Sequence, residues 1–145
     1  MTREIYEDDS LRRILTQTKT IAIVGLSNNP TRASHHVGDF LTRQTYQTYG
    51  INPGLAGQKV AGMQVYASLK DVPVAIDMVD VFRNSDDAAQ VVADALALNP
   101  LPKVIWMQLG VINLEAAAQA RAKGIEVIMD RCPAIEIPRL KLRRV

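Results

Sequence analysis

Cysteine is nearly absent from this chain of 145 residues, which has only Cys132. One thiol excludes a disulfide within the chain and a cysteine-rich zinc site, so we expect a reducing compartment, most simply the cytoplasm. Long hydrophobic runs are absent too. The longest strand-like apolar run, Ile21 to Leu26, falls far short of the roughly 18 residues that a membrane-spanning helix needs. Because no charged and apolar leader opens the chain either, we expect neither secretion nor membrane insertion.

Two widespread nucleotide-binding motifs are also missing. The dinucleotide fingerprint G-x-G-x-x-G fails after Gly25, because Ser27 and Pro30 take the positions of its later glycines. No Walker-type G-K-[ST] occurs in the chain. The second expected strand ends at Asn52 rather than at an acid that would hold a ribose 2′-hydroxyl in the NAD manner. These absences disfavour NAD and ATP as ligands.

Catalytic and metal-binding side chains are scarce. The only histidines, His35 and His36, are adjacent on an expected helix and point in different directions, which disfavours a shared metal ion. Asp77 and Asp80 stand three apart on an expected strand, so they face opposite sides of it and make a poor acid-base pair. We expect both to make strand-end or loop contacts, and Cys132 to be a packed small residue. The sequence therefore predicts no catalytic residue and no metal site.

The overall composition is that of a folded domain. Hydrophobic residues make up 48% of the chain and charged residues 22%, which argues against disorder, and the length suits one domain. The formal net charge is +2, and residues 139–145 hold three arginines and a lysine. We expect residues 1–138 to form the domain and residues 139–145 to be a solvated basic tail, without nucleic acid as a partner.

Apolar, β-branched stretches alternate with amphipathic stretches along the chain. Strands are expected at residues 19–25, 46–51, 65–66, 75–82, 103–109 and 125–129. Helices are expected just after a capping cluster at 8–10, then at 34–43, 86–98 and 114–123. This alternation predicts an α/β fold, namely a single doubly wound, Rossmann-like domain with a mostly parallel sheet of five or six strands.

The loop of residues 25–34, G-L-S-N-N-P-T-R-A-S, joins the first expected strand to the next helix. Ligands of open α/β sheets bind beyond the carboxyl ends of the strands. Gly25 permits close backbone approach, and the following helix offers free N–H groups and a positive dipole end. Arg32 adds a forked cationic donor that suits phosphate oxygens. This combination fits a pyrophosphate.

Six segments in order along the chain resemble the CoA-binding domain family related to the amino-terminal domain of the succinyl-CoA synthetase α subunit, in its small stand-alone branch. They are residues 21–34, I-N-P-G at 51–54, V-Y-A-S-L at 65–69, D-M-V-D-V-F-R at 77–83, W-M-Q-L-G at 106–110 and M-D-R-C at 129–132. The resemblance covers nearly the whole chain and implies CoA or an acyl-CoA as the ligand. The phosphorylated histidine of the synthetase lies in a second domain that is not encoded here, so the ligation chemistry is not carried over.

The resemblance implies three groups of ligand-contacting residues. The diphosphate would be faced by Gly25, Ser27, Asn29, Arg32 and Ser34. The adenosine part would lie beside Asn52 and Pro53, with its extra ribose phosphate near Lys59. The wall along the nucleotide and the pantetheine end would be formed by Val81, Phe82, Arg83, Gln108 and Gly110.

The leading expectation is a small cytoplasmic module that binds CoA or an acyl-CoA without catalysing a reaction. Its protein partner, if it has one, is not identified by the sequence. One alternative is a small nucleotide-cofactor-dependent enzyme, either an NAD(P) reductase or an acyltransferase, against which the missing motifs and catalytic groups count. Another is a regulatory protein that senses a nucleotide and binds a macromolecule through the basic tail.

Overall fold

A computed structural model describes residues 4–144, in which a seven-stranded sheet forms the middle layer. Its strands are β1 (Thr20–Val24), β2 (Gln47–Ile51), β3 (Lys59–Val60), β4 (Met63–Tyr66), β5 (Met78–Val81), β6 (Val104–Met107) and β7 (Glu126–Ile128). They lie in the order β3-β4-β2-β1-β5-β6-β7. All neighbours are parallel except β3 and β4, which form an antiparallel hairpin.

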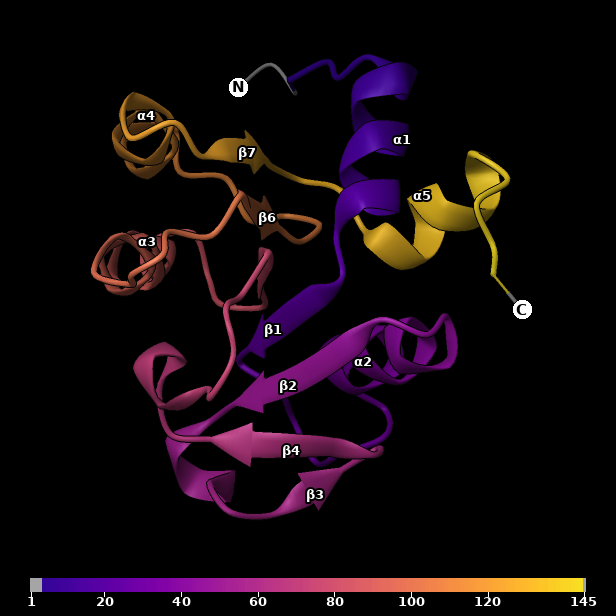
Figure 1. Ribbon diagram of the computed structural model, residues 1–145, viewed down its shortest axis with the longest axis vertical. Helices are drawn as coiled ribbons and strands as arrows, with labels where there is room; N and C mark the ends of the chain where they lie inside the picture. The colour runs from indigo at the N-terminus through magenta and orange to yellow at the C-terminus, as the bar shows by residue number, and fades with distance from the viewer. Residues whose placement is uncertain (1–3, 145) are drawn as a thin grey trace.

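Helices cover both faces of this sheet (Figure 1). One face carries α1 (Asp8–Gln17), α2 (Ala33–Arg43) and α5 (Pro133–Arg139), and the other carries α3 (Ala88–Leu96) and α4 (Leu114–Ala122). Short 3₁₀ helices occupy Pro53–Leu55 and Leu69–Asp71. The alternation of side chains along each strand divides the core into two apolar clusters, one on each face.

The central strand β1 explains why the molecule is built in two halves. Its sequence T-I-A-I-V is buried at every position, as a parallel strand covered on both faces must be. β1 pairs with β2 on one side and with β5 on the other. The chain first winds through α2 towards β2 and later continues from β5 through α3 towards β6. Strand order therefore reverses between β1 and β5, where doubly wound folds bind their ligands.

The predicted fold class is confirmed, and all six expected strands are present. The sequence missed β3, because two residues in a tight hairpin carry too little periodicity to be recognised. It also missed α5, whose seven residues include Pro133 and Pro138. Residues 8–10 form the first turn of α1 rather than a cap before it. None of the helices between residues 4 and 144 is long and apolar enough to cross a membrane.

The basic segment after Pro138 packs against the domain. Arg139 bonds Asp8 of α1 at 2.9 Å and Glu136 at 3.0 Å. Leu140 is 3% exposed and lies in the core cluster beneath α1, α2 and α5. The Arg144 guanidinium lies 4.2 Å from the centre of the Tyr46 ring. The segment that we expected to be a solvated tail is therefore held in place as far as Arg144.

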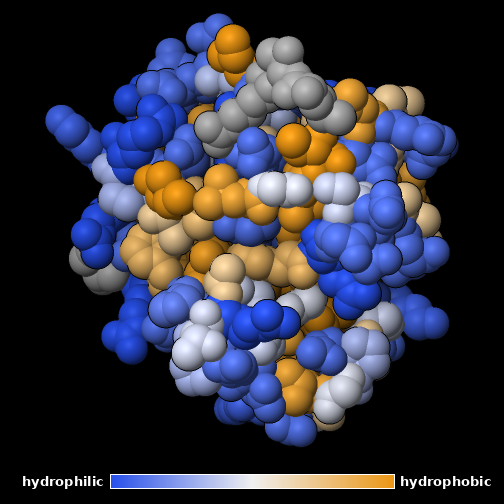
Figure 2. All heavy atoms as spheres, turned by 180° about the vertical axis from the view of Figure 1, so that it is seen from behind, coloured by the Kyte–Doolittle hydropathy of each residue, from blue (hydrophilic) through white to orange (hydrophobic). Residues whose placement is uncertain are grey.

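The surface mixes charged and apolar residues. Seen from behind, apolar residues form a band across the middle of the molecule, between polar and charged ones (Figure 2). Large apolar side chains that are at least partly exposed include Leu109, at 49%, and Ile135, at 51%. Leu109 belongs to the loop after β6, and Ile135 to the first turn of α5. Both therefore lie at the end of the sheet where the strands terminate.

The close approach between the ends of β1 and β5 depends on Gly25. This residue has a φ of +91°, and a Cβ atom placed on it would lie 2.5 Å from the carbonyl oxygen of Phe82. A hydrogen bond holds the two segments together here, since the Phe82 N–H donates to the Val24 carbonyl at 2.9 Å. Only glycine allows both this backbone conformation and this contact.

Leu140→Ala tests whether the carboxyl-terminal segment belongs to the core. We expect it to lower the free energy of unfolding by about 2 to 4 kcal/mol, because it leaves a cavity in a fully packed cluster. Arg143→Ala is the matched control and should cost less than about 1 kcal/mol, since the side chain is exposed and its guanidinium lies over the Phe40 ring, 5.9 Å from the centre. Urea unfolding measures both values, and equal effects would contradict this packing.

Gly25→Ala tests the contact between the two halves of the sheet. We expect it to cost about 2 to 5 kcal/mol, because a strained backbone and a steric clash act together. Gly62→Ala is the control, since Gly62 has a φ of +82° but no atom lies within 4 Å of its Cβ position. That variant should lose only about 1 to 2 kcal/mol. A Gly25→Ala protein as stable as Gly62→Ala would refute the steric argument.

Candidate functional site

Two cavities meet at Gly25, beyond the carboxyl ends of β1 and β5. The first, which we call the α3-side cavity, has a volume of about 280 Å³ and is lined by Pro53, Arg83, Gln90 and other residues. The second, the α2-side cavity, has a volume of about 240 Å³ and lies against the start of α2. Gly25 lines both. Together they form the crevice expected where strand order reverses.

The first loop is shaped by its own side chains. The Ser34 hydroxyl accepts a hydrogen bond from the Ser27 N–H at 2.9 Å, and the Ser27 hydroxyl accepts one from the Asn29 N–H at 3.0 Å. Oδ1 of Asn29 then accepts the N–H of Thr31 at 3.0 Å. Three of the predicted site residues therefore hold the loop in its curved form. Ser27 and Ser34 also line the α2-side cavity.

The loop leads directly into the amino-terminal end of α2. Ala33 and Ser34 are its first residues, and their amides are not bonded within the helix, as in any first turn. Arg32 precedes them, and its exposed guanidinium has no hydrogen bond or ion pair with any residue from 4 to 144. The α2-side cavity thus has an unpaired cation and free N–H donors, which suit an anion.

A second guanidinium lies on the opposite side of Gly25. The Cδ atom of Arg83 is 3.2 Å from the Cβ position of Gly25, and this side chain lines the α3-side cavity. Its ion pair with Asp87 is long, at 3.4 Å, and the Arg83 side chain is 49% exposed. An exposed pair of this length is weak, so Arg83 is free to turn towards a phosphate. Arg32 and Arg83 therefore flank the glycine.

Asn52 and Pro53 follow β2 directly. Nδ2 of Asn52 donates to the Leu26 carbonyl at 2.9 Å, while its Oδ1 accepts the Gly54 N–H at 2.9 Å. Asn52 therefore ties the first loop to the turn after β2. Pro53 lines the α3-side cavity directly.

The loop after β6 is tied to both neighbouring loops. The Gly110 N–H donates to Oδ1 of Asp130 at 2.7 Å, and the Gly110 carbonyl accepts from the Ser85 hydroxyl at 3.3 Å. The same hydroxyl accepts the Ile112 N–H at 3.0 Å. Our residue set missed Ser85 and Asp130. Asp130 stands in the M-D-R-C segment at 129–132, and that segment was the available signal.

Six of the predicted residues line neither cavity, namely Asn29, Asn52, Lys59, Val81, Gln108 and Gly110. Val81 is completely buried and faces the core under α3 and α4. Lys59 is exposed on β3, the strand at the edge of the sheet, and lines neither cavity. Phe82, by contrast, lines the α2-side cavity.

Asp77, just before β5, and Asp80, within β5, have different surroundings. Asp77 does make a strand-end contact, because its Oδ2 accepts the N–H groups of Lys19 at 2.9 Å and Thr20 at 3.2 Å. For Asp80 the prediction was wrong, since its side chain lies in the middle of the strand and is completely buried. Burial raises the pKa of the Asp80 carboxyl well above its usual value.

Potential catalytic groups are dispersed. Cys132 is 5% exposed, as predicted for a packed residue, and burial is the main reason why the pKa of its thiol is raised. His35 is half-buried and His36 is exposed on α2. Across the described chain, residues 4–144, no three His, Cys, Asp or Glu side chains converge as metal ligands would.

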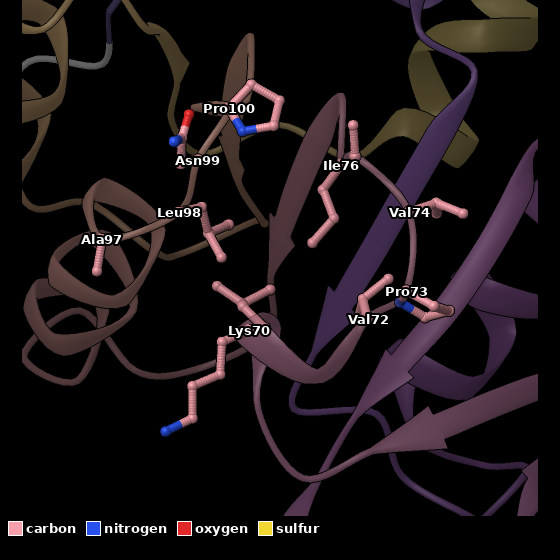
Figure 3. Close-up of a pocket in the computed structure, with 11 residues that line it drawn as sticks. Lys70, Val72, Pro73, Val74, Ile76, Ala97, Leu98, Asn99 and Pro100 are labelled. Carbon is pink, nitrogen blue, oxygen red and sulfur yellow. The ribbon is translucent and has the colours of Figure 1, made fainter.

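A further cavity, of about 350 Å³, lies at the other end of the sheet (Figure 3). It is lined mainly by apolar side chains of the segment before β5 and the segment after α3, among them Val72, Ile76 and Leu98. The Lys70 amino group extends away from this lining (Figure 3). No charged group is directed into the cavity in that view, so it is poorly suited to phosphates.

Known proteins resemble this chain in sequence and in fold. Residues 19–138 match the family described as CoA binding domain. The uncharacterized protein YneT of Bacillus subtilis is 36% identical over 122 residues, which are 84% of this chain and 87% of YneT. A solved structure from Thermus thermophilus is 35% identical, with a TM-score of 0.87 over 93% of this chain and 99% of its own.

The fold also occurs inside a larger enzyme. A dinucleotide-forming acetyl-coenzyme A synthetase of Ca. Korarchaeum cryptofilum aligns over 83% of this chain and 27% of its own, with 22% identity and a TM-score of 0.62. That likeness concerns the fold alone. The family match, by contrast, spans most of the sequence and includes every loop at the crevice. On this ground the chain belongs to the CoA binding domain family.

Proposed function

We propose that the protein is a small cytoplasmic module that binds CoA or an acyl-CoA and performs no chemical step itself. The observation that carries this proposal is the placement of Arg32 and Arg83 in the two cavities that share Gly25. A linear ligand with a central diphosphate and two different ends fits such a crevice. The family match supports CoA as that ligand.

The diphosphate lies over Gly25 in this proposal. Without a side chain, Gly25 lets the phosphate oxygens approach the backbone, and the first amides of α2 donate to them. Arg32 is unpaired within residues 4–144, and Arg83 has only a weak partner, so both guanidinium groups can bind the phosphates in a charge-assisted manner. Two flanking cations match the two negative charges of a diphosphate.

The adenosine part occupies the α3-side cavity. Pro53 and Val91 provide apolar contact surface there, and Gln90 and Asp94 offer polar groups that can bond an adenine amino group. Acidic side chains in this cavity disfavour a phosphate at its base. The extra ribose phosphate of CoA therefore points outwards, and Lys59 is our candidate for its partner.

The pantetheine arm extends across Phe82 towards the loop of Gln108 and Gly110. Phe82 lines the α2-side cavity, and Leu109 adds apolar surface that is 49% exposed. The arm carries two amides between short aliphatic segments, so it needs this combination of apolar contact and a few polar groups. The sulfur end then lies near α5, outside the buried core.

Binding without turnover follows from the chemistry of the nearby groups. The Cys132 thiol is buried and its pKa is raised, which makes a reactive thiolate unfavourable. A single buried thiol also fits a reducing compartment. Among residues 4–144, neither His35 nor His36 has an acidic partner that would help it to activate a nucleophile.

Calorimetric titration with CoA tests the proposal. We expect saturable binding by the wild-type protein, stronger than that of NAD, NADP or ATP. Arg32→Ala and Arg83→Ala should each weaken CoA binding about ten- to hundredfold, because each removes a charge-assisted hydrogen bond. Arg43→Ala is the matched control, since Arg43 lies at the other end of α2 and pairs with Asp39.

The outcomes separate the alternatives. A failure of folded, ligand-free protein to bind CoA would overturn the proposal. Tighter binding of NAD or NADP would favour the reductase, and turnover of an acyl-CoA would favour the acyltransferase. Comparison of CoA with dephospho-CoA tests Lys59, because Lys59→Ala should weaken only the ligand that carries the extra phosphate.

A further inference from the structure

Asp80 is an unusual residue for the middle of a parallel sheet. It lies on β5 between Ile23 of β1 and Trp106 of β6, and its side chain is completely buried. Neither carboxyl oxygen has a hydrogen-bond partner among residues 4–144. A buried charge without a partner is strongly unfavourable, so the carboxyl group is in its neutral form.

A second unsatisfied acceptor lies nearby. Gln108 follows β6 by one residue and is 6% exposed, and its Oε1 atom also lacks a donor among the described residues. Asp80, Trp106 and Gln108 lie on the same face of the sheet, because side chains alternate along each strand. Gln108 is thus the diagonal neighbour of Asp80 on the adjacent strand, within reach of a long side chain.

Cys132 lies next to both of these side chains. The Gln108 side chain lowers the pKa of the Cys132 thiol and Asp80 raises it, so both side chains lie close to that thiol. The three polar groups therefore form one buried cluster on the face covered by α2 and α5. With Asp80 charged, three oxygen acceptors of this cluster have no donor, namely both carboxyl oxygens and Oε1 of Gln108. With Asp80 neutral, its O–H group is the missing donor.

We propose that Asp80 is a positioning residue whose protonated carboxyl donates a hydrogen bond to Oε1 of Gln108. This bond gives Oε1 of Gln108 a donor, leaves only the carbonyl oxygen of Asp80 without one, and holds the Gln108 amide beside Cys132. It also anchors the start of the loop of residues 108–112 to the neighbouring strand β5. That loop borders the pantetheine end, so the effect of Asp80 on a ligand rests on the proposed function, whereas the hydrogen bond does not.

Other ionisable groups on this face are accounted for. The helix α5 contributes Glu136, which is paired with Arg139, and Cys132 precedes it. The helices α1 and α2 present apolar residues and Ser34 to the sheet. The ionisable residues of α2 are not among its buried residues; they are His35, His36, Asp39 and Arg43. Burial is the cause of the raised pKa of the Asp80 carboxyl, and none of these groups lowers that pKa, so the carboxyl keeps its proton.

The stability of wild type and Asp80→Asn, measured against pH, tests the proton. The unfolded chain releases this proton above a pH of about 4, whereas the folded protein keeps it. Folding therefore becomes less favourable as pH rises: from about pH 5 upwards, until the folded protein also releases the proton, the folding constant of wild type should fall by up to about tenfold per pH unit relative to Asp80→Asn. Urea unfolding, followed by the fluorescence of the single tryptophan, Trp106, supplies the measurement.

A matched control uses the other aspartate of this region. Asp77 lies three residues before Asp80, and Asp77→Asn leaves the Asp80 carboxyl intact. The slope of stability against pH that is due to Asp80 should therefore persist in that variant. If Asp80→Asn retains the wild-type slope, Asp80 does not hold a proton and the proposal is refuted.

Hydrogen exchange tests positioning separately from protonation. Asp80→Leu has a similar size but no donor, whereas Asp80→Asn offers an N–H to Gln108. Amides of residues 108–111 should exchange about tenfold faster or more in Asp80→Leu, and Asp80→Asn should restore slow exchange. The amides of β1 serve as the internal reference for global unfolding. Equal loop exchange in the two variants, relative to β1, would overturn the positioning role.

The ligand experiment comes last. CoA affinity should survive in Asp80→Asn and fall in Asp80→Leu, because only the first keeps Gln108 in place. If wild type does not bind CoA at all, the proposed function fails, and the pH and exchange measurements still decide the role of Asp80.

Discussion

The close backbone contact at Gly25 is the constraint on which the site depends. β1 and β5 are neighbours in the sheet, and the chain leaves them towards opposite faces, one through α2 and the other through α3. A Cβ at Gly25 would lie 2.5 Å from a backbone oxygen of the loop after β5. Since backbone cannot move aside as a side chain can, the crevice exists only with glycine here. Its two cavities share this residue for the same reason.

Much of the fold could be predicted because it follows from local patterns. The buried strand β1 reads as an unbroken β-branched run, and the six expected strands and four expected helices all occur. β3 and α5 could not be found in this way, because their lengths of two and seven residues provide almost no period. The basic segment after α5 looked like a solvated tail, since sequence shows its charges but not Leu140 in the core or the ring beneath Arg144.

The residues of the site also differ in how far the sequence could identify them. The first loop is contiguous in sequence, so its glycine, hydroxyls and arginine could be recognised together, and Gly25, Ser27, Arg32 and Ser34 do line one cavity. Residues that act across loops were harder to identify. Ser85 and Asp130 bond Gly110 from two other strand ends, and no spacing in the sequence records those bonds. Val81 was misjudged because only the structure shows that it faces the core.

Asp80 shows why a polar residue in an apolar strand needs the whole neighbourhood to be interpreted. Its spacing from Asp77 correctly excluded a paired role, yet it could not distinguish a strand-end contact from a buried acid. Oδ2 of Asp77 accepts hydrogen bonds from backbone amides at the start of β1, and the Asp77 side chain is partly exposed to water. Asp80, three residues later and within the strand, lies beside Ile23, Trp106 and the unsatisfied amide oxygen of Gln108 instead. The same carboxyl group therefore accepts backbone hydrogen bonds at the end of a strand and is a neutral donor in the middle of one, because burial disfavours the charged form.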